Sequence, residues 1–266
     1  MKSNLSIIGL GTRSVNQLTL EALTILKKCD VCLILPITSE ETELKLQELG
    51  IKNLVNLKYL YSSGHKDTDN YQKILSEIVS YTGKYSEVAL LIPGHPRIGV
   101  TLVQWLEKLN GKVISLTVLP GISSFSAMIN DLKIDPIEMG SSILDANRIL
   151  LFEYEIEPTI NHFIYHVCSV GTSNVHVDSP YLENRLDLLK TYLLKFYDEN
   201  HQVALVCSGV SANDPSDIKW SSIKDMNQFL EFVHFGTTLY VPGAKPKKIN
   251  KNYYKLLTSS EKSCSL

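Results

Sequence analysis

The sequence lacks the features that mark membrane, secreted and nucleic-acid-binding proteins. No apolar run approaches the roughly 20 residues that a membrane-spanning helix needs, and the apolar part of the N-terminal MKSNLSIIGLG is too short for a secretory signal. The net charge of −2 shows neither the basic excess that attracts nucleic acid nor the acidic excess typical of disordered chains. We therefore expect a cytoplasmic globular protein without nucleic-acid or membrane partners.

Cysteine is scarce and has no regular spacing. An odd number of cysteines, five, favours free thiols in a reducing compartment. Cys29 and Cys32 form one C-x-x-C without a second pair at zinc spacing, and no obvious carboxylate or thiol accompanies His162 and His166. We therefore predict no metal site, and we expect these cysteines in the core and these histidines in the core or a pocket.

The dinucleotide-binding fingerprint is incomplete. Gly9 and Gly11 follow a predicted strand at 5–10, but Ser14 stands where G-x-G-x-x-G needs its third glycine. A dinucleotide-binding Rossmann site is therefore not expected.

Strands and helices alternate through the first 130 residues, which predicts a mostly parallel sheet. The second part has a different pattern, and a Pro-Gly at 120–121 suggests a boundary between an N-terminal α/β domain at 1–119 and a C-terminal α/β domain at 120–257. Residues 258–266 are predicted to be a disordered tail. The expected strands are 5–10, 31–35, 54–60, 88–92, 113–119, 149–152, 163–167, 203–208 and 237–241. The expected helices are 18–28, 40–49, 71–81, 100–109, 123–132, 181–196, a short piece within 221–232, and 253–257.

The central segment of the chain is LLIPGHPRIGV at 90–100. Its buried strand must end at Pro93 and Gly94, because proline lacks an N–H and glycine accepts positive φ. The turn that follows lies at the carboxyl end of a parallel strand, where ligands bind in open α/β sheets.

Four separated segments together resemble the tetrapyrrole methylase family over residues 4 to 257. They are Gly9-x-Gly11, PGHP at 93–96, LPGISS at 119–124 and TTLYVP at 237–242. The resemblance implies two α/β domains, a mostly parallel N-terminal sheet and a mixed C-terminal sheet, with S-adenosylmethionine bound in the cleft between them.

Further segments are similar to the borosin methyltransferases, which methylate backbone amide nitrogens of peptides. GHP at 94–96, LPGIS at 119–123, DLKIDP at 131–136, the loop from Tyr61 to Tyr71, and TTLYVPGAK at 237–245 match their pattern. Tetrapyrrole methylases more often have an acidic residue at the position of His95. The chain ends soon after its last predicted helix, so we expect the split kind, which acts on a separate precursor peptide. The resemblance also implies a homodimer.

The resemblance assigns roles to individual residues. The cofactor contacts are assigned to Gly9, Pro93, Gly94, His95, Ile98, Gly99, Ser123, Ser124, His166, Thr237 and Thr238. The catalytic candidates are Tyr71 and Tyr61, because an amide nitrogen is a poor nucleophile and needs its proton removed or its developing oxyanion stabilised. A phenol has an ordinary pKa of about 10, and Lys66 would be the cation that lowers it. The alternative is that both tyrosines only pack at the edge of the loop.

Three positions depart from the borosin pattern. Asp67 stands in place of an arginine, His166 in place of a glutamine, and Pro93 in place of an aromatic residue. Two other functions therefore stay open: methylation of a tetrapyrrole or another small molecule, and cofactor binding without turnover. Arg97 and Asp145 are expected to be surface residues. The sequence leaves open which peptide is methylated, and whether Asp67 abolishes or only alters the activity.

Overall fold

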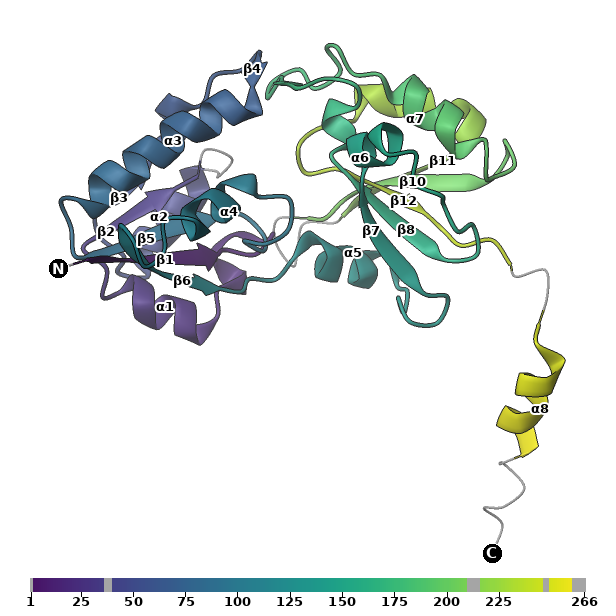
Figure 1. Ribbon diagram of the computed structural model, residues 1–266, viewed down its shortest axis with the longest axis horizontal. Coiled ribbons are helices and arrows are strands. Elements are labelled where there is room, and N and C mark those ends of the chain that lie inside the picture. Colours follow the sequence, from purple (N-terminus) through teal and green to yellow (C-terminus); the bar gives the residue numbers. More distant parts are fainter. Residues whose placement is uncertain (1, 36–39, 210–215, 246–248, 260–266) are drawn as a thin grey trace, which may run out of the picture.

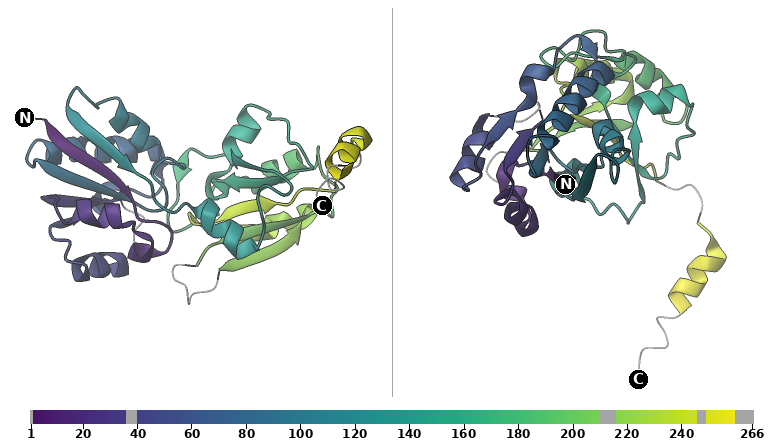
Figure 2. Two further views of the ribbon diagram at one scale, coloured as in Figure 1. Left: turned by 90° about the horizontal axis from the view of Figure 1, so that it is seen from below. Right: turned by 60° about the vertical axis from the view of Figure 1, so that its left-hand side comes forward.

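Two five-stranded sheets with their helices lie side by side, and α8 projects beyond the second sheet (Figures 1 and 2). The computed structural model describes residues 2–35, 40–209, 216–245 and 249–259. The chain passes from the first domain to the second through residues 120–123, between the last strand of one sheet and helix α5. The predicted boundary at 119–121 falls in this connection.

The first sheet is parallel throughout, in the order β3-β2-β5-β1-β6. Its central strands are almost fully buried, which explains why they are continuous apolar runs rather than alternating ones. The strands are β1 (Ser3–Gly9), β2 (Val31–Ile34), β3 (Leu54–Asn56), β5 (Glu87–Ile92) and β6 (Ile114–Leu119).

Helices cover both faces of the first sheet. On one face, α3 (Asp67–Thr82) and α4 (Thr101–Glu107) share an apolar cluster with alternate residues of the strands. On the other face, α1 (Leu20–Leu26) and α2 (Glu40–Glu48) contribute to a second cluster. Because successive side chains of a strand point to opposite faces, one sheet supplies both clusters. The short 3-10 helices η1 (Ser14–Gln17) and η2 (Leu57–Leu60) complete this domain.

The second sheet is mixed, in the order β11-β10-β12-β8-β7. Only β7 and β8 run parallel, so the predicted combination of a parallel and a mixed sheet is confirmed. Helix α5 packs against one face, and α6, α7 and η4 pack against the other. The elements are α5 (Ser124–Leu132), β7 (Ser141–Asp145), α6 (Ala146–Leu151), β8 (Asn161–Tyr165), η3 (Val167–Ser169), α7 (Leu186–Leu193), β10 (Gln202–Cys207), β11 (Asp217–Ser222), η4 (Ile223–Glu231), β12 (Thr238–Val241) and α8 (Lys251–Ser259).

Two predicted elements differ from the structure, and one strand was missed. Residues 149–151 of the strand expected at 149–152 belong to helix α6, because Asp145 accepts a hydrogen bond from the backbone N–H of Arg148 and caps that helix. The strand beside β8 is instead β7, which was not predicted. Helix α3 begins at Asp67, four residues before the expected start at Tyr71.

Some boundaries also move. The strand expected at 54–60 ends at Asn56, whose side chain accepts a hydrogen bond from the backbone N–H of Lys58 and starts η2. The helix expected at 181–196 is the shorter α7. Residues 258–259 belong to α8, whereas 260–266 lie outside the described residues.

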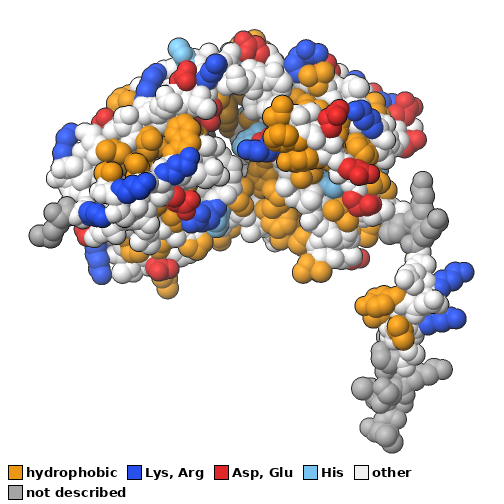
Figure 3. Space-filling view, viewed as in Figure 1, with side chains coloured by type: hydrophobic (Ala, Val, Ile, Leu, Met, Phe, Trp, Pro, Cys, Tyr) orange, Lys and Arg blue, Asp and Glu red, His pale blue; other side chains and the backbone are white. Residues whose placement is uncertain are grey.

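A small β-bridge joins the two domains away from the covalent connection. Strand β4 (His65–Lys66) pairs antiparallel with β9 (Asn174–Val175). Gly64 donates a 2.8 Å hydrogen bond to the carbonyl oxygen of Val175, and the backbone N–H of Val177 donates to the Ser63 hydroxyl. The domains therefore form an arch, and the surface is hollowed between them (Figures 1 and 3).

No helix within the described ranges combines the length and the apolar character that crossing a bilayer requires.

Candidate functional site

Three glycine turns meet at the carboxyl ends of β1, β5 and β6. Gly94 donates a 2.9 Å hydrogen bond to the carbonyl oxygen of Gly11, and Gly11 donates back to that of Gly94. A Cβ atom on Gly9 would lie 2.6 Å from the carbonyl oxygen of Gly94 and 2.7 Å from the Cα of Gly121. Only glycine permits this contact between backbones, so these turns are packed together as one unit.

Beside this unit, Gly94 leaves open space. Its φ is +73°, and a Cβ atom built on it would meet no atom within 4 Å. The neighbouring loop is turned on itself, because Ile98 donates to the carbonyl oxygen of His95, and the backbone N–H of Arg97 donates to His95 Nδ1. An exposed glycine backbone at the carboxyl ends of parallel strands is where a ligand can approach closely. The backbone at Gly94 therefore leaves room for a ligand at this edge of the sheet.

The second domain borders this space with hydroxyl groups. Ser123 caps α5 by accepting a hydrogen bond from Ser126, and Ser124 shares a 2.9 Å hydrogen bond with the hydroxyl of Tyr165 at the end of β8. The antiparallel register that pairs Leu239 with Ile164 sets Thr238 beside Tyr165. Ser124 and Thr238 are thus both neighbours of Tyr165.

Thr237 is nearby, but its hydroxyl has an internal partner. It donates a 2.6 Å hydrogen bond to the carbonyl oxygen of His234 and accepts one from the backbone N–H of that residue. Thr237 therefore closes the turn that leads into β12. Its predicted cofactor contact stays a prediction, as do those of the other residues assigned to the cofactor.

His166 lies at the domain junction, directly after β8. Its backbone is left-handed, with φ +59°, and its Nδ1 lies 2.5 Å from Oδ2 of Asp145. Its Nε2 would be 3.0 Å from a Cβ atom on Gly99, so the ring touches the loop after β5. Asp145 was expected to be a plain surface residue. That expectation was wrong, because its carboxylate is half-buried against the imidazole.

Asp145 is held ionised by its neighbours. Burial raises the pKa of this carboxyl, but hydrogen bonds from His166 and from the backbone of Arg148 outweigh it and lower the pKa below its ordinary value. The sequence signal for Asp145 would have been its position as the cap of α6 at the end of β7. Because β7 was not recognised, that signal was missed.

The two tyrosines lie around Asp67 rather than around a cation. Tyr61 donates a 2.8 Å hydrogen bond to Asp67 Oδ1. Burial raises the pKa of Tyr61, and the charge of Asp67 raises it further. Tyr71 is buried edge-on against Trp105, and the same two causes raise its pKa. Both phenols therefore stay protonated, which is the opposite of the effect expected from Lys66.

Lys66 belongs to the β-bridge. Its side chain is exposed, and its backbone pairs with Asn174 of β9. The predicted cation is thus a residue of the contact between the domains, directly before the first turn of α3.

A further polar contact joins the domains and was not anticipated from the sequence. Asp131 of α5 is 5% exposed and pairs with Arg13 at 3.2 Å. Asp131 also accepts a 2.6 Å hydrogen bond from the Ser208 hydroxyl. Arg13 follows the first glycine turn, so this pair fixes α5 against the loop after β1. Elsewhere in the described part of the chain, no three His, Cys, Asp or Glu side chains converge on a metal position.

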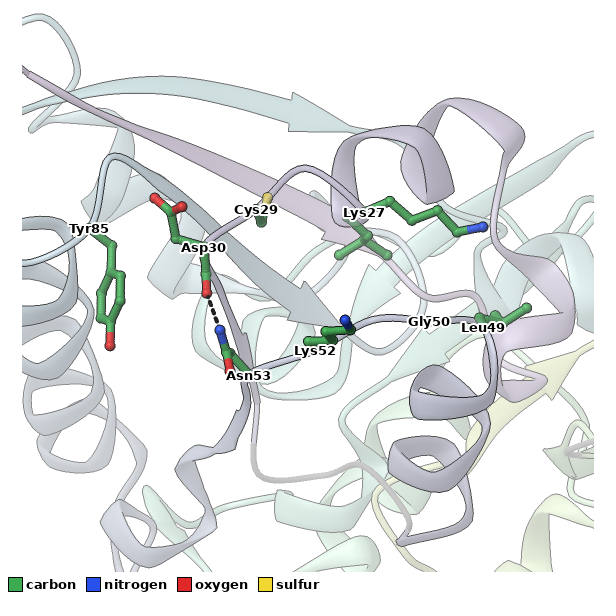
Figure 4. Close-up of a pocket in the computed structure, with 9 residues that line it drawn as sticks. Lys27, Cys29, Asp30, Leu49, Gly50, Lys52, Asn53 and Tyr85 are labelled. Atoms are coloured by element: carbon green, nitrogen blue, oxygen red, sulfur yellow. Dashed lines mark hydrogen bonds between the residues drawn. The ribbon is translucent and has the colours of Figure 1, made fainter.

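A separate hollow lies elsewhere. It has a volume of about 730 Å³ and opens at the amino ends of β2, β3 and β5, where the Asn53 amide donates to the carbonyl oxygen of Asp30 (Figure 4). Ligands of open α/β sheets bind at the carboxyl ends. Size alone therefore does not identify the site, and the junction of the domains is the better candidate.

Comparison with known proteins agrees with this geometry. The family model of the tetrapyrrole (corrin/porphyrin) methylases matches residues 4–214. A methyltransferase/type I borosin cyclic peptide precursor of Gymnopilus junonius is 27% identical over 90% of this chain and 57% of its own length. A second such protein, of Mycena rosella, is 24% identical over 93% of this chain and 62% of its own length. The chain thus spans about three fifths of these relatives.

The fold has solved counterparts. The crystal structure of uroporphyrin-III C-methyltransferase from Thermus thermophilus superposes with a TM-score of 0.63 and 17% identity, over 91% of this chain and 93% of that one. The architecture, the glycine turns and the family match agree, and the chain belongs to the tetrapyrrole (corrin/porphyrin) methylases.

Proposed function

We propose that the chain is an S-adenosylmethionine-dependent methyltransferase that methylates backbone amide nitrogens of a separate precursor peptide. The observation that carries this proposal is the open face of Gly94 beside three interlocked glycine turns, at the edge of the sheet where ligands bind. The family membership and the similarity to borosin precursor proteins over nine tenths of the chain support it.

The cofactor would be held by residues of both domains. The first domain would supply backbone and ring contacts from the residues of its glycine turns: Gly9, Pro93, Gly94, His95, Ile98 and Gly99. The second domain would supply polar groups from the other side: Ser123, Ser124, His166, Thr237 and Thr238. When bound, S-adenosylmethionine provides a methyl group on a sulfonium, which a nucleophile displaces. The task of these residues is to hold donor and acceptor in line and close together.

A peptide suits the shape of the site. The β4–β9 bridge spans the hollow between the domains, so a ligand that reaches the junction passes beneath it. A two-stranded bridge has free backbone edges, and an extended peptide can pair with such an edge. In the described residues the chain after β12 leads away from the hollow to α8, so that segment does not fill it (Figure 1).

Tyr71 acts as a hydrogen-bond donor to the substrate in this proposal. Because burial and Asp67 raise their pKa values, Tyr71 and Tyr61 keep their protons, and Tyr61 already donates its proton to Asp67. A protonated phenol can donate to the carbonyl oxygen of the amide, where negative charge develops as the nitrogen becomes nucleophilic. Lys66, next to Asp67, adds positive charge at the mouth of the site.

The proposed enzyme is a homodimer. Helix α8 has no buried residue among those described, and its apolar side chains lie together on one face opposite two lysines (Figure 3). An amphipathic helix whose apolar face is exposed among the described residues is typical of an interface. We propose a second copy as its partner.

The test combines binding with product analysis. Calorimetry with S-adenosylmethionine and its demethylated product should show binding, and tandem mass spectrometry of peptides encoded near the gene should show backbone N-methylation after incubation with the protein and cofactor. A tetrapyrrole that gains a methyl group instead would establish the small-molecule alternative. Cofactor binding without any methylated product would establish a non-catalytic protein, and absence of binding at millimolar cofactor would remove the proposal.

A further inference from the structure

His166 and Asp145 form a hydrogen-bonded pair whose orientation is defined. Oδ2 of an ionised Asp145 can only accept, so Nδ1 of His166 carries the proton and donates across 2.5 Å. In the neutral ring Nε2 then has a free lone pair. That nitrogen faces Gly99, in the loop that follows the open glycine turn, and the side chain of His166 is 43% exposed. An acceptor nitrogen is thus presented at the domain junction.

The backbone around both residues fixes the geometry of the pair. His166 has a left-handed backbone directly after β8, and Asp145 ends the parallel neighbour β7, with which Tyr165 is in register. Asp145 also accepts from the backbone of Arg148, which fixes its second oxygen. The ring therefore projects from the carboxyl edge of the second sheet toward the carboxyl edge of the first.

The other ionisable groups around the ring come from three elements. Asp145 ends β7, and Asp67 in the first turn of α3 is close enough for the charge of His166 to lower its pKa against the larger, opposite effect of burial. Cys168 in η3 lies near both carboxylates, and burial raises the pKa of its thiol to about 11, so it stays neutral. Of these groups, only Asp145 is in hydrogen-bond contact with the ring.

Neither tyrosine is in a state to accept the proton of the substrate nitrogen. Both phenols are protonated, and the hydroxyl of Tyr61 already donates to Asp67. Methylation of an amide nitrogen nevertheless releases one proton for each methyl group. This proton needs an acceptor, and a residue with a free lone pair at the junction can supply one.

We propose that His166, oriented by Asp145, accepts the proton that the substrate nitrogen loses during methyl transfer. This inference rests on the proposed function. His166 is then a catalytic residue as well as a neighbour of the cofactor, and Asp145 is a positioning residue that acts through it.

The N–H bond of the amide breaks, and its proton passes to Nε2 of His166, which becomes an imidazolium. The electron pair of the nitrogen forms the new N–CH3 bond, and the electron pair of the old S–CH3 bond stays on sulfur, so a sulfonium becomes a neutral thioether. Asp145 stabilises the imidazolium, in the manner of the carboxylate in a Ser-His-Asp triad. Solvent later removes the proton.

The first experiment needs no substrate. Nitrogen-15 NMR of the imidazoles in the free protein, with the His166 signals identified by their loss in His166→Gln, should show His166 protonated at Nδ1 when neutral. In Asp145→Asn the proton should shift toward Nε2. A His166 that is protonated at Nε2 in the parent protein would overturn the proposal, because that nitrogen could then accept nothing.

The second experiment measures turnover against pH. The parent kcat should fall at low pH as the acceptor is protonated, and His166→Gln should lower kcat by about 10²-fold or more and lose this acid limb. The KM for the peptide should change little. The kcat of Asp145→Asn should lie between those of the parent and His166→Gln. The control His201→Gln, far from the junction, should have the parent kcat. A His166→Gln enzyme with the parent rate and the parent pH profile would overturn the proposal.

Cofactor affinity distinguishes a role of His166 in proton transfer from a role in cofactor binding. If calorimetry shows equal affinity in the parent protein and His166→Gln while turnover falls, the loss is one of proton transfer. If affinity falls in parallel with turnover, His166 only binds the cofactor, and this inference is wrong. If the parent protein itself forms no methylated peptide, the proposed function fails, irrespective of the protonation state that NMR reports.

Discussion

The carbonyl oxygen of Gly94 lies 2.5 Å from the position that a Cβ atom on Gly121 would occupy. The turns after β5 and β6 are therefore in contact through their backbones, although 26 residues of helix, loop and strand separate them in the sequence. This contact fixes the position of the two turns at the carboxyl edge of the first sheet. The chain leaves this edge toward the second domain.

Gly121→Ala should disturb that edge. The methyl group would overlap with the backbone of Gly94 and Gly9, so the turns must separate. We expect a lower melting temperature and at least a tenfold loss of cofactor affinity, because the space beside Gly94 changes shape. Gly83→Ala is a suitable control, since a Cβ there would lie 3.3 Å from its nearest atom, the Ser80 carbonyl oxygen. Differential scanning fluorimetry and calorimetry measure both effects, and an unchanged Gly121→Ala protein would contradict the expectation.

Tyr71→Phe tests the oxyanion role. The ring would keep its contact with Trp105, so the fold should be retained, whereas the donated hydrogen bond would be lost. Turnover should fall by about 10²-fold or more, with cofactor affinity nearly unchanged. Lys66→Ala should cost less, because a lysine is a mobile point charge on an exposed strand. If Tyr71→Phe methylates the peptide at the parent rate, the prediction is wrong and Tyr71 only packs against its neighbours.

The buried His162 should make the stability depend on pH. Its Nε2 donates to the carbonyl oxygen of Glu157, its Nδ1 accepts from the Ser142 hydroxyl, and burial lowers its pKa below the ordinary 6.5. The unfolded chain therefore binds a proton before the folded chain does. Stability should be fully present above about pH 6.5 and decline as the pH falls toward the lower folded value. Urea unfolding at pH 7.5, 6.5 and 5.5 measures this, and His162→Gln should flatten the decline. A parent protein equally stable at all three pH values would refute the assignment.

The proposed dimer gives a prediction for α8. Tyr253, Tyr254, Leu256 and Leu257 are all more than half exposed and share one face. Replacing Leu256 and Leu257 by glutamate should shift the protein from dimer to monomer in multi-angle light scattering at tens of micromolar. Lys255→Glu changes charge on the opposite face and should leave the dimer intact. A parent protein that is monomeric at this concentration would exclude the interface.

The arrangement of the first sheet could be predicted from the sequence because its strands are buried apolar runs separated by helices. The strands of the second sheet were harder to predict. The residues of β7, Ser141–Asp145, contain only two apolar side chains, whereas the more apolar 149–152 lies in a helix. A short apolar run fits either a buried strand or one side of a helix, and only the cap at Asp145 distinguishes them.

The relations across the domains could not be deduced from local patterns. The β-bridge joins pairs of residues that are 110 and 108 positions apart, and each strand is only two residues long. The partner of His166 was missed for a related reason, since Asp145 becomes its neighbour only through the parallel pairing of β7 with β8. The resemblance to a family identified which loops gather at the junction. It did not indicate that the tyrosines would face an aspartate.

The bridge also limits how the two domains can move. Besides the connection at residues 120–123, the domains are joined by the Arg13–Asp131 ion pair and by the β4–β9 pair. The hydrogen bonds of the bridge contribute about 0.5–1.5 kcal/mol each, so thermal fluctuations can break them. Once they are broken, the ring of protein around the hollow is open on that side, while the covalent connection and the ion pair still hold the two domains together.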